Sequence, residues 1–292
     1  MQALIKSWFT YLTVEKGLST NTLAAYRRSI ERYESWLASE KLDDPKKITT
    51  KHIESYYASL RGSNLSDATA NHALVVVRQF HDFLLREGLV DQDVAKDVHP
   101  AKGEKALPEF LTLAEVDQVI DAAKDQCEAA LVELLYGTGA RVSEALALSV
   151  DDVNRYEGFV VLTGKGNKQR IVPLGSKAQQ AISAYIRGQR KDLVKPNSPD
   201  PHRLFLNRLG RPYSRQSAYN NIQALLARAG IEKTVSPHTF RHTFATHMLA
   251  GGADMRVVQE LLGHASISTT QVYTHVRNAE VLEAHHQFHP RG

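Results

Sequence analysis

Residues 159–174 read FVVLTGKGNKQRIVPL, and this stretch decides the fold of the second half of the chain. Two runs rich in β-branched and aliphatic residues flank the turn sequence GKGN, which is the pattern of a β-hairpin. Most of the sequence on either side instead places apolar residues at intervals of three and four, which favours helices. We therefore predict a mainly α protein whose second half is an α+β domain with a small antiparallel sheet.

The chain divides into two domains that a short linker joins. Residues 1–98 show helical periodicity throughout. Residues 99–108, HPAKGEKALP, contain two prolines, a glycine and several charges without apolar periodicity, as linkers do. Thr112 and Glu115 then have the spacing of a capping box, which starts a new helix. We expect a helical bundle over residues 1–98, the linker, and a second domain over residues 109–292.

Positive charge is concentrated in one stretch of the second domain. Residues 109–162 carry 3 Lys and Arg against 11 Asp and Glu, whereas residues 163–241 carry 15 against 3, in a chain of net charge +4. Such a basic segment is typical of a surface that binds a polyanion, for example nucleic acid. Charge alone leaves open a basic surface that is simply solvated.

Composition also bears on where the protein acts. No apolar run of the sequence approaches the 18 residues that a membrane span needs. The first residues, MQALIKSWFTYL, lack the pattern of an export signal. The single cysteine, Cys127, excludes an internal disulfide and a cysteine-rich zinc module. We expect a cytoplasmic protein.

Residues 236–242, SPHTFRH, have the composition of a helix start, with Ser at the N-cap and Pro at the first helical position. His238 and Arg241 are three residues apart and share one face of the first turn, where free backbone N–H groups favour an anion. The pattern predicts a phosphate site. A helix-capping histidine beside a surface arginine would give the same sequence.

Four further residues could act at the same site. Arg141 follows two glycines in GTGARVSE at a helix start, from which a guanidinium can bind two phosphate oxygens. Lys165 lies in the hairpin turn, His264 follows a glycine that ends a helix, and Tyr273 lies in a short predicted helix. Taken singly, each has a structural interpretation as a surface charge, a turn residue or a core aromatic.

In their order along the chain, these residues resemble the catalytic set of the tyrosine site-specific recombinase family. The shared features are Arg in GARVSE, Lys in the GKGNK hairpin, His-x-x-Arg at a helix start, LGH, and Tyr nine residues after that His. The sequence LSTNTLAAYRRSI in the first domain is similar to the family's core-binding, SAM-like domain, so the resemblance covers nearly the whole chain. The tail HHQFHPRG is most similar to the Xer recombinases, particularly the XerD type.

The resemblance implies a DNA strand-exchange enzyme that works by type IB topoisomerase-like transesterification. Tyr273 would attack the phosphodiester and form a 3′-phosphotyrosyl link, which conserves the bond and makes the step reversible without ATP. Arg141 and Arg241 would hold the non-bridging oxygens, and His264 would donate a further hydrogen bond.

Two more residues would transfer protons. A phenol has an ordinary pKa of about 10, so Tyr273 needs a base, and the resemblance assigns this role to His238. Lys165 would protonate the departing 5′-oxygen. The same resemblance implies that the reaction needs no cofactor and no metal.

The resemblance also implies partners. These are a duplex DNA recombination site, a synaptic tetramer that can include a paralogous Xer recombinase, and a septal DNA translocase. The biological outcome would be the resolution of chromosome dimers to monomers at cell division. The tail at residues 279–292 would dock onto a neighbouring protomer. The basic residues that we expect to contact DNA are Arg27, Arg28, Lys51, Lys168, Arg170 and Arg215.

Three alternatives stay open at this point. A metal site could use His238, His242 and His247, although the basic stretch has few carboxylates and no HExxH pattern. A phage or transposon integrase would use the same chemistry as an Xer recombinase. A non-catalytic DNA-binding protein would hold DNA without cutting it, and the loss of Tyr273 or of a site arginine would have pointed to it.

Overall fold

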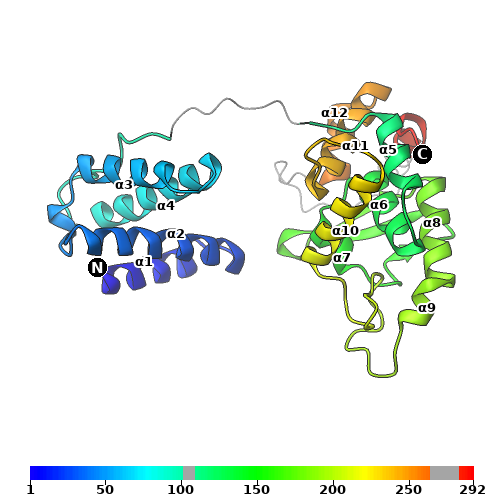
Figure 1. Ribbon diagram of the computed structural model, residues 1–292, viewed down its shortest axis with the longest axis horizontal. Coiled ribbons are helices and arrows are strands. Elements are labelled where there is room, and N and C mark those ends of the chain that lie inside the picture. The colour runs from blue at the N-terminus through cyan, green and yellow to red at the C-terminus, as the bar shows by residue number, and fades with distance from the viewer. Residues whose placement is uncertain (101–108, 264–282) are drawn as a thin grey trace. The chain divides into compact units, whose positions relative to one another are not determined.

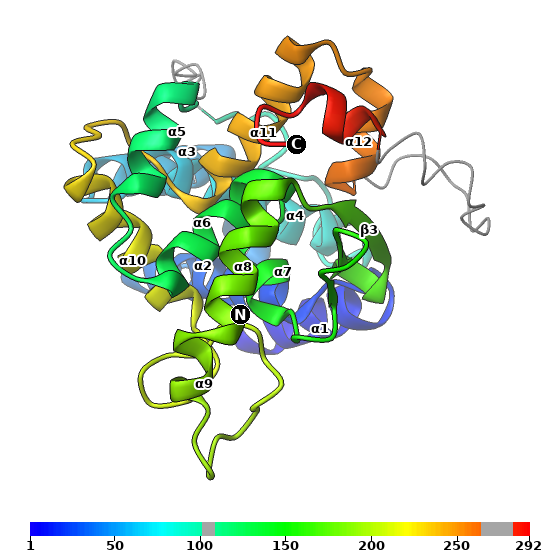
Figure 2. The same cartoon turned by 90° about the vertical axis from the view of Figure 1, so that its right-hand side faces the viewer.

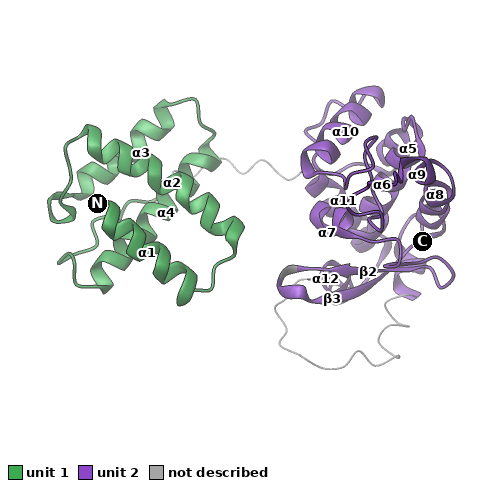
Figure 3. Ribbon diagram, turned by 90° about the horizontal axis from the view of Figure 1, so that it is seen from below, with its two compact units in different colours: residues 1–106 green, residues 107–292 purple. Residues whose placement is uncertain are grey.

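The computed structural model describes residues 1–100, 109–263 and 283–292. The chain forms two compact units, Met1–Ala106 and Leu107–Gly292 (Figure 3). The described part of the first unit is helical, and the second unit combines helices with a three-stranded antiparallel sheet (Figure 1). The predicted fold class is therefore confirmed. The predicted linker falls mostly on residues outside the described ranges, so its bounds stay a prediction.

The first unit is a bundle around an aromatic core. Trp8, Tyr33, Tyr56 and Phe80 are fully buried, and the rings of Trp8 and Phe80 meet edge to face with their centroids 5.4 Å apart. The hydroxyl of Tyr33 shares a hydrogen bond of 2.9 Å with Nε2 of His81, so this buried phenol keeps a polar partner. In chain order the elements are α1 (Gln2–Val14), α2 (Thr20–Ser39), η1 (Pro45–Lys47), α3 (Thr50–Gly62) and α4 (Asp67–Arg86).

The second unit is built around one helix, α6 (Gln126–Thr138), which is buried on nearly every side. Helices α8 (Ser176–Arg187) and α11 (Pro237–Gly251) pack directly against it. The described helices are each too short or too polar to cross a lipid bilayer. The other described elements are α5 (Leu113–Asp121), α7 (Val142–Ala147), β1 (Val153–Asn154), β2 (Phe159–Thr163), η2 (Lys165–Asn167), β3 (Gln169–Pro173), α9 (Gln189–Leu193), α10 (Arg215–Arg228) and α12 (Met255–Leu262).

The sheet has the order β1-β2-β3, and both pairings are antiparallel. Strands β2 and β3 form the predicted hairpin, in which Phe159 pairs with Pro173 and Thr163 pairs with Gln169. Strand β1 was not predicted, because its two residues are too few to show an alternating pattern.

Local signals located the helix ends well. The backbone N–H of Thr112 donates to Glu115 at 2.7 Å and the backbone N–H of Glu115 donates to Thr112 Oγ1 at 3.2 Å, which confirms the capping box. The backbone N–H of Ser236 donates to Thr239 Oγ1 at 3.0 Å at the start of α11. Helix α7 has Arg141 at its N-cap and ends at Ala147.

The C-terminal segment packs against its own unit. Residues 283–288 are helical and lie beside α11 (Figure 2). Nε2–H of His285 donates to the carbonyl of Gly137 at 2.8 Å, and the ring of His289 stacks on that of His285 with centroids 4.8 Å apart. Arg291 pairs with Asp117 and Glu133. Docking of the tail onto a neighbouring protomer stays a prediction.

We predict that acid releases this segment. Burial lowers the pKa of His285 to about 4 and that of His289 to about 3. A freed histidine titrates near 6.5, so docking is fully stable above that pH and weakens as the pH falls toward 4. At pH 5 the loss should be roughly 2 kcal/mol for each histidine. Hydrogen exchange of residues 283–292 at pH 7.5 and pH 5 measures it.

A pair of variants separates protonation of the buried histidines from general effects of acid on the protein. His289→Phe keeps a ring at the buried position but cannot be protonated, so it should reduce the pH dependence of exchange. His286 is exposed on the same helix, and His286→Gln should leave the dependence unchanged. The explanation fails if both variants respond to pH like the native chain.

Candidate functional site

Arg141 lies at the N-cap of α7 and is tied to the third residue of that helix. Its backbone N–H donates to Oε2 of Glu144 at 2.9 Å, and its Nη1 donates to Oε1 at 2.8 Å. The side chain of Arg141 is 41% exposed, whereas that of Glu144 is 4% exposed. A buried carboxylate thus orients a guanidinium that solvent can still reach.

Arg170 lies on β3 and is buried. Its Nη1 and Nη2 donate to the two oxygens of Glu144 at 3.0 and 2.7 Å, in the forked geometry that arginine favours with a carboxylate. Its Nε donates to the carbonyl of Leu261 at 2.8 Å. One side chain therefore joins the sheet to α7 and to the end of α12.

Arg241 lies in the second turn of α11 and is also buried. Its Nη1 donates to the carbonyl of Gly139 at 2.9 Å, and its Nη2 donates to the carbonyl of Leu262 at 2.6 Å. A guanidinium has five N–H groups, so further donors of Arg241 stay available for an anion. Arg170 and Arg241 thus bind two successive carbonyls, those of Leu261 and Leu262, at the end of α12.

We call Arg141, Arg170 and Arg241 the arginine cluster. Burial lowers the pKa of Arg241 to about 10, and the charges of Arg141 and Arg170 add to the effect. Burial would raise the pKa of Glu144, but hydrogen bonds from Arg170 and Arg141 lower it to about 2. At neutral pH two cations pair with Glu144, and a third, Arg241, lies close enough for its pKa to respond to their charges. This excess of positive charge attracts an anionic group.

Gly139 allows the elements around the cluster to approach closely. It ends α6 in the left-handed conformation, with φ of 59°. A Cβ at this position would lie 2.7 Å from Cδ1 of Phe244 on α11 and 2.8 Å from Cδ2 of Leu262 on α12. Both the left-handed backbone and the close packing therefore require a glycine at position 139.

The structure describes part of the predicted catalytic set. It brings Arg141 and Arg241 into one cluster and places His238 on the first turn of α11, where it is exposed. Lys165 begins η2 in the hairpin turn. His264 and Tyr273 lie outside the described residues.

The predicted DNA contacts differ in their exposure. Arg170 was expected on the DNA-binding surface, but it is 8% exposed and its three nitrogens all donate within the protein. In the described structure the guanidinium of Arg170 faces the protein interior and pairs with Glu144, so its contact with DNA stays a prediction. The other five candidates are exposed, namely Arg27, Arg28, Lys51, Lys168 and Arg215.

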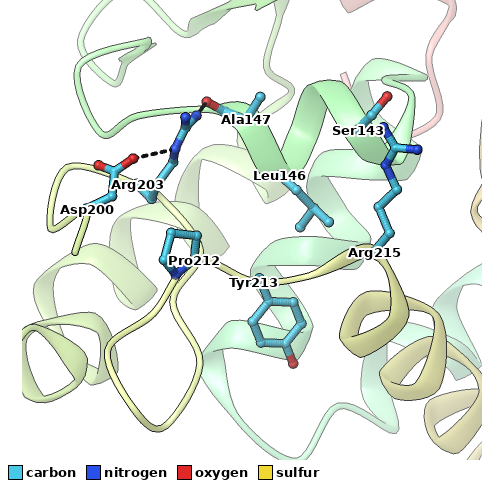
Figure 4. A pocket seen from close by; sticks show the side chains of 8 residues that line it. All are labelled: Ser143, Leu146, Ala147, Asp200, Arg203, Pro212, Tyr213 and Arg215. Atoms are coloured by element: carbon cyan, nitrogen blue, oxygen red, sulfur yellow. Dashed lines mark hydrogen bonds and ion pairs between the residues drawn. The ribbon is translucent and has the colours of Figure 1, made fainter. Parts of the chain in front are cut away.

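Arg215 also lines a pocket of about 310 Å³ beside α7. Figure 4 shows its side chain pointing toward Ser143, two residues after Arg141 along the chain. On the other side of this pocket, Arg203 pairs with Asp200 at 2.8 Å and donates to the carbonyl of Ala147. Arg215 thus adds an exposed positive charge near the start of α7.

Sequence reasoning missed Glu144, although a signal was present. A carboxylate three residues after a helix N-cap is the reciprocal half of a capping box, and Glu144 holds that position after Arg141.

The alternative of a histidine metal site gains no support from the described residues. Within the described ranges, no group of three or more His, Cys, Asp or Glu side chains is placed to hold a metal ion. Of the three histidines considered, His247 shares a hydrogen bond of 2.8 Å with the hydroxyl of Tyr136. His238 and His242 are exposed on α11.

Comparison with known proteins covers both units. Residues 109–280 match the family described as "Phage integrase family", and residues 5–88 match "Phage integrase, N-terminal SAM-like domain". The tyrosine recombinase XerD of Corynebacterium glutamicum is 50% identical, over 100% of this chain and 99% of the relative.

Solved structures are also similar. The crystal structure of XerA recombinase has a TM-score of 0.51 at 30% identity and matches over 99% of this chain and 100% of its own. A lambda integrase dimer bound to a COC′ core site has a TM-score of 0.73 over 97% of this chain and 95% of its own. At 17% identity, that second likeness concerns the fold alone.

We predict that Gly139→Ala destabilises the second unit. The new methyl group would occupy a left-handed position and would contact Phe244 and Leu262 at less than 3 Å. The unfavourable backbone and the overpacking should together lower the free energy of unfolding by about 3 kcal/mol. Denaturant titration measures the change.

Gly230→Ala is the matched control. Gly230 also has a positive φ, of 69°, but a Cβ there would meet nothing within 4 Å. Its cost should be about 1 kcal/mol, the backbone part alone. Equal losses in the two variants would show that the close approach at Gly139 has no energetic weight.

Proposed function

This chain belongs to the phage integrase family and is a site-specific tyrosine recombinase, and we propose that it cuts and rejoins duplex DNA through a 3′-phosphotyrosyl link to Tyr273. The observation that carries the proposal is the arginine cluster. Its three positive charges outnumber the one negative charge of Glu144, the carboxylate that pairs with Arg141 and Arg170. The side chain of Arg141 is also partly open to solvent. A phosphodiester is an anion that such a site stabilises, more strongly as charge grows in the transition state.

The arginines have distinct parts in this proposal. Arg141 and Arg241 donate hydrogen bonds to the non-bridging oxygens of the scissile phosphate. Glu144 keeps Arg141 oriented, so little reorganisation is needed when the phosphate arrives. His264 follows directly after Gly263, the residue that ends α12, and donates a further hydrogen bond.

Proton transfer falls to two residues outside the cluster. His238, on the same helix face as Arg241, accepts the proton of the Tyr273 hydroxyl. Lys165 protonates the 5′-oxygen as it leaves. The phosphotyrosyl bond conserves the energy of the broken bond, so rejoining proceeds by the reverse attack of the 5′-hydroxyl and needs no nucleotide. We propose no cofactor and no metal.

The similarity to XerD recombinases supports a biological role. We propose that the enzyme acts in the cytoplasm and resolves chromosome dimers to monomers at cell division, rather than integrating a phage or transposon. It would act as a synaptic tetramer on two DNA sites, with a paralogous Xer recombinase as the other half and a septal DNA translocase as activator. The tail at residues 279–292 would dock onto the neighbouring protomer in that assembly.

Binding of DNA is proposed to use exposed basic side chains of each unit. Each phosphate contact releases counterions, so affinity should fall steeply with salt. The residues concerned are Arg27, Arg28, Lys51, Lys168 and Arg215, all of them exposed.

Tyr273→Phe tests the nucleophile. The variant loses only the attacking oxygen, so it should bind its site as the native chain does but form no covalent adduct on a nicked suicide substrate. Gel shift measures binding, and denaturing electrophoresis detects the adduct. An adduct that persists in the variant would rule out Tyr273.

Lys165→Ala tests the proton donor. Cleavage should be severely slowed on ordinary DNA, because an alkoxide is a poor leaving group. A bridging 5′-sulfur leaves as a thiolate, which hardly needs a proton, so this substrate should restore cleavage. Arg141→Ala is the control and should stay slow, because its role is on the non-bridging oxygens. Equal rescue of both variants, or of neither, contradicts the role of Lys165.

A further inference from the structure

We propose that Arg170 is a positioning residue of the recombinase, which acts on the scissile phosphate through Glu144 and Arg141 without touching DNA. The inference rests on the proposed function of the arginine cluster. It also assigns Arg170 a role that differs from that of the exposed basic residues around it.

Arg170 is buried, and three of its five N–H groups donate within the protein. All three of its nitrogens donate within the protein, two to Glu144 and one to the carbonyl of Leu261. The side chain is 8% exposed and the carboxylate that it binds is 4% exposed. A buried ion pair of this kind is costly to break from one side, because the remaining charge would be left without compensation.

Glu144 passes this restraint on to Arg141. Its Oε1 accepts from Nη1 of both Arg141 and Arg170, and its Oε2 accepts from the backbone N–H of Arg141 and from Nη2 of Arg170. Without Arg170, the carboxylate would keep only its hydrogen bonds from Arg141, the residue that it has to orient. Arg170 therefore fixes the plane of the carboxylate, and the carboxylate fixes Arg141.

The pair of Arg170 and Glu144 also lies against the backbone just before Lys165, the proposed proton donor, and just before His264. A Cβ on Gly263, which precedes His264, would lie 3.1 Å from Cδ of Arg170. A Cβ on Gly164, which precedes Lys165, would lie 3.3 Å from Oε1 of Glu144 and 3.8 Å from Nη1 of Arg170. The ion pair thus packs against the backbone directly before both residues.

Lysine could not replace Arg170 in this arrangement. The ammonium group of lysine has one nitrogen. The observed contacts need three nitrogens in one plane, two that donate to Glu144 and one that donates to the carbonyl of Leu261. Arg170→Lys keeps the positive charge, so it tests geometry and not net charge. The variant should bind DNA normally and should form the covalent adduct roughly a hundredfold more slowly, as small misplacements of a reacting group do.

The chain offers a matched control in Arg190. This arginine is also nearly buried in the same unit, and its Nε donates to the carbonyls of Arg203 and Leu204, both at 3.1 Å. None of its recorded partners belongs to the arginine cluster. Arg190→Lys should therefore lower the free energy of unfolding of the second unit without changing how strongly the arginine cluster stabilises the charge of the phosphate.

A substrate with a methylphosphonate at the cleavage position separates positioning from folding. A methyl group there replaces one non-bridging oxygen and removes the negative charge that Arg141 is proposed to stabilise. The loss caused by Arg141→Ala should then shrink, and so should the loss caused by Arg170→Lys. Any loss in Arg190→Lys should be the same on both substrates. Single-turnover adduct formation on nicked duplexes measures each rate, and gel shift measures binding.

The outcomes are distinguishable. An equal loss for Arg170→Lys on the two substrates, with a shrinking loss for Arg141→Ala, would overturn the positioning role and leave the proposed function standing. No adduct in the native chain on either substrate would overturn the proposed function and this inference with it. If Arg170→Lys does not fold, Glu144→Gln, a neutral isostere, takes its place and should show the same substrate dependence.

Discussion

The buried contact between Glu144 and Arg170 is the constraint on which the rest of the second unit's site depends. Removing two charges from water is costly, and the cost is offset only when hydrogen bonds satisfy both groups. Glu144 meets this condition by accepting from α7 and β3, and Arg170 meets it by also donating to the end of α12. Helix α7, the sheet and α12 are therefore held together by polar groups, in addition to the apolar core beneath them.

Sequence patterns predicted the elements, because the signals for elements are local. The capping box at Thr112 and the hairpin each depend on residues within a few positions of one another. The pairing of Arg170 with Glu144 joins residues 26 positions apart. No local pattern says which basic side chain of a basic stretch turns inward. Alternation along β3 was nevertheless a usable signal, since it puts Arg170 on the same buried face as Val172.

The site was predictable in its residue types and less so in its contacts. Arg141 and Arg241 were identified from motifs, and the structure brings their charges into one cluster. Their fixed orientation depends on Glu144 and on the carbonyls of Gly139 and Leu262, which come from distant parts of the chain. Spacing in sequence carries no information about such partners, because backbone carbonyls are the same in every residue.

The pairing of Arg291 with Glu133 has a consequence for any segment that could replace the C-terminal residues on the surface of the second unit. Glu133 is 4% exposed on the central helix α6, and burial raises its pKa even with the guanidinium beside it. If the C-terminal segment left, that carboxylate would lose its counterion, a state that favours proton uptake while it stays buried. Any segment that replaces the C-terminal residues must therefore bring a cation to this position, or Glu133 must take a proton from solvent. Glu133 thus favours a positively charged occupant at this position.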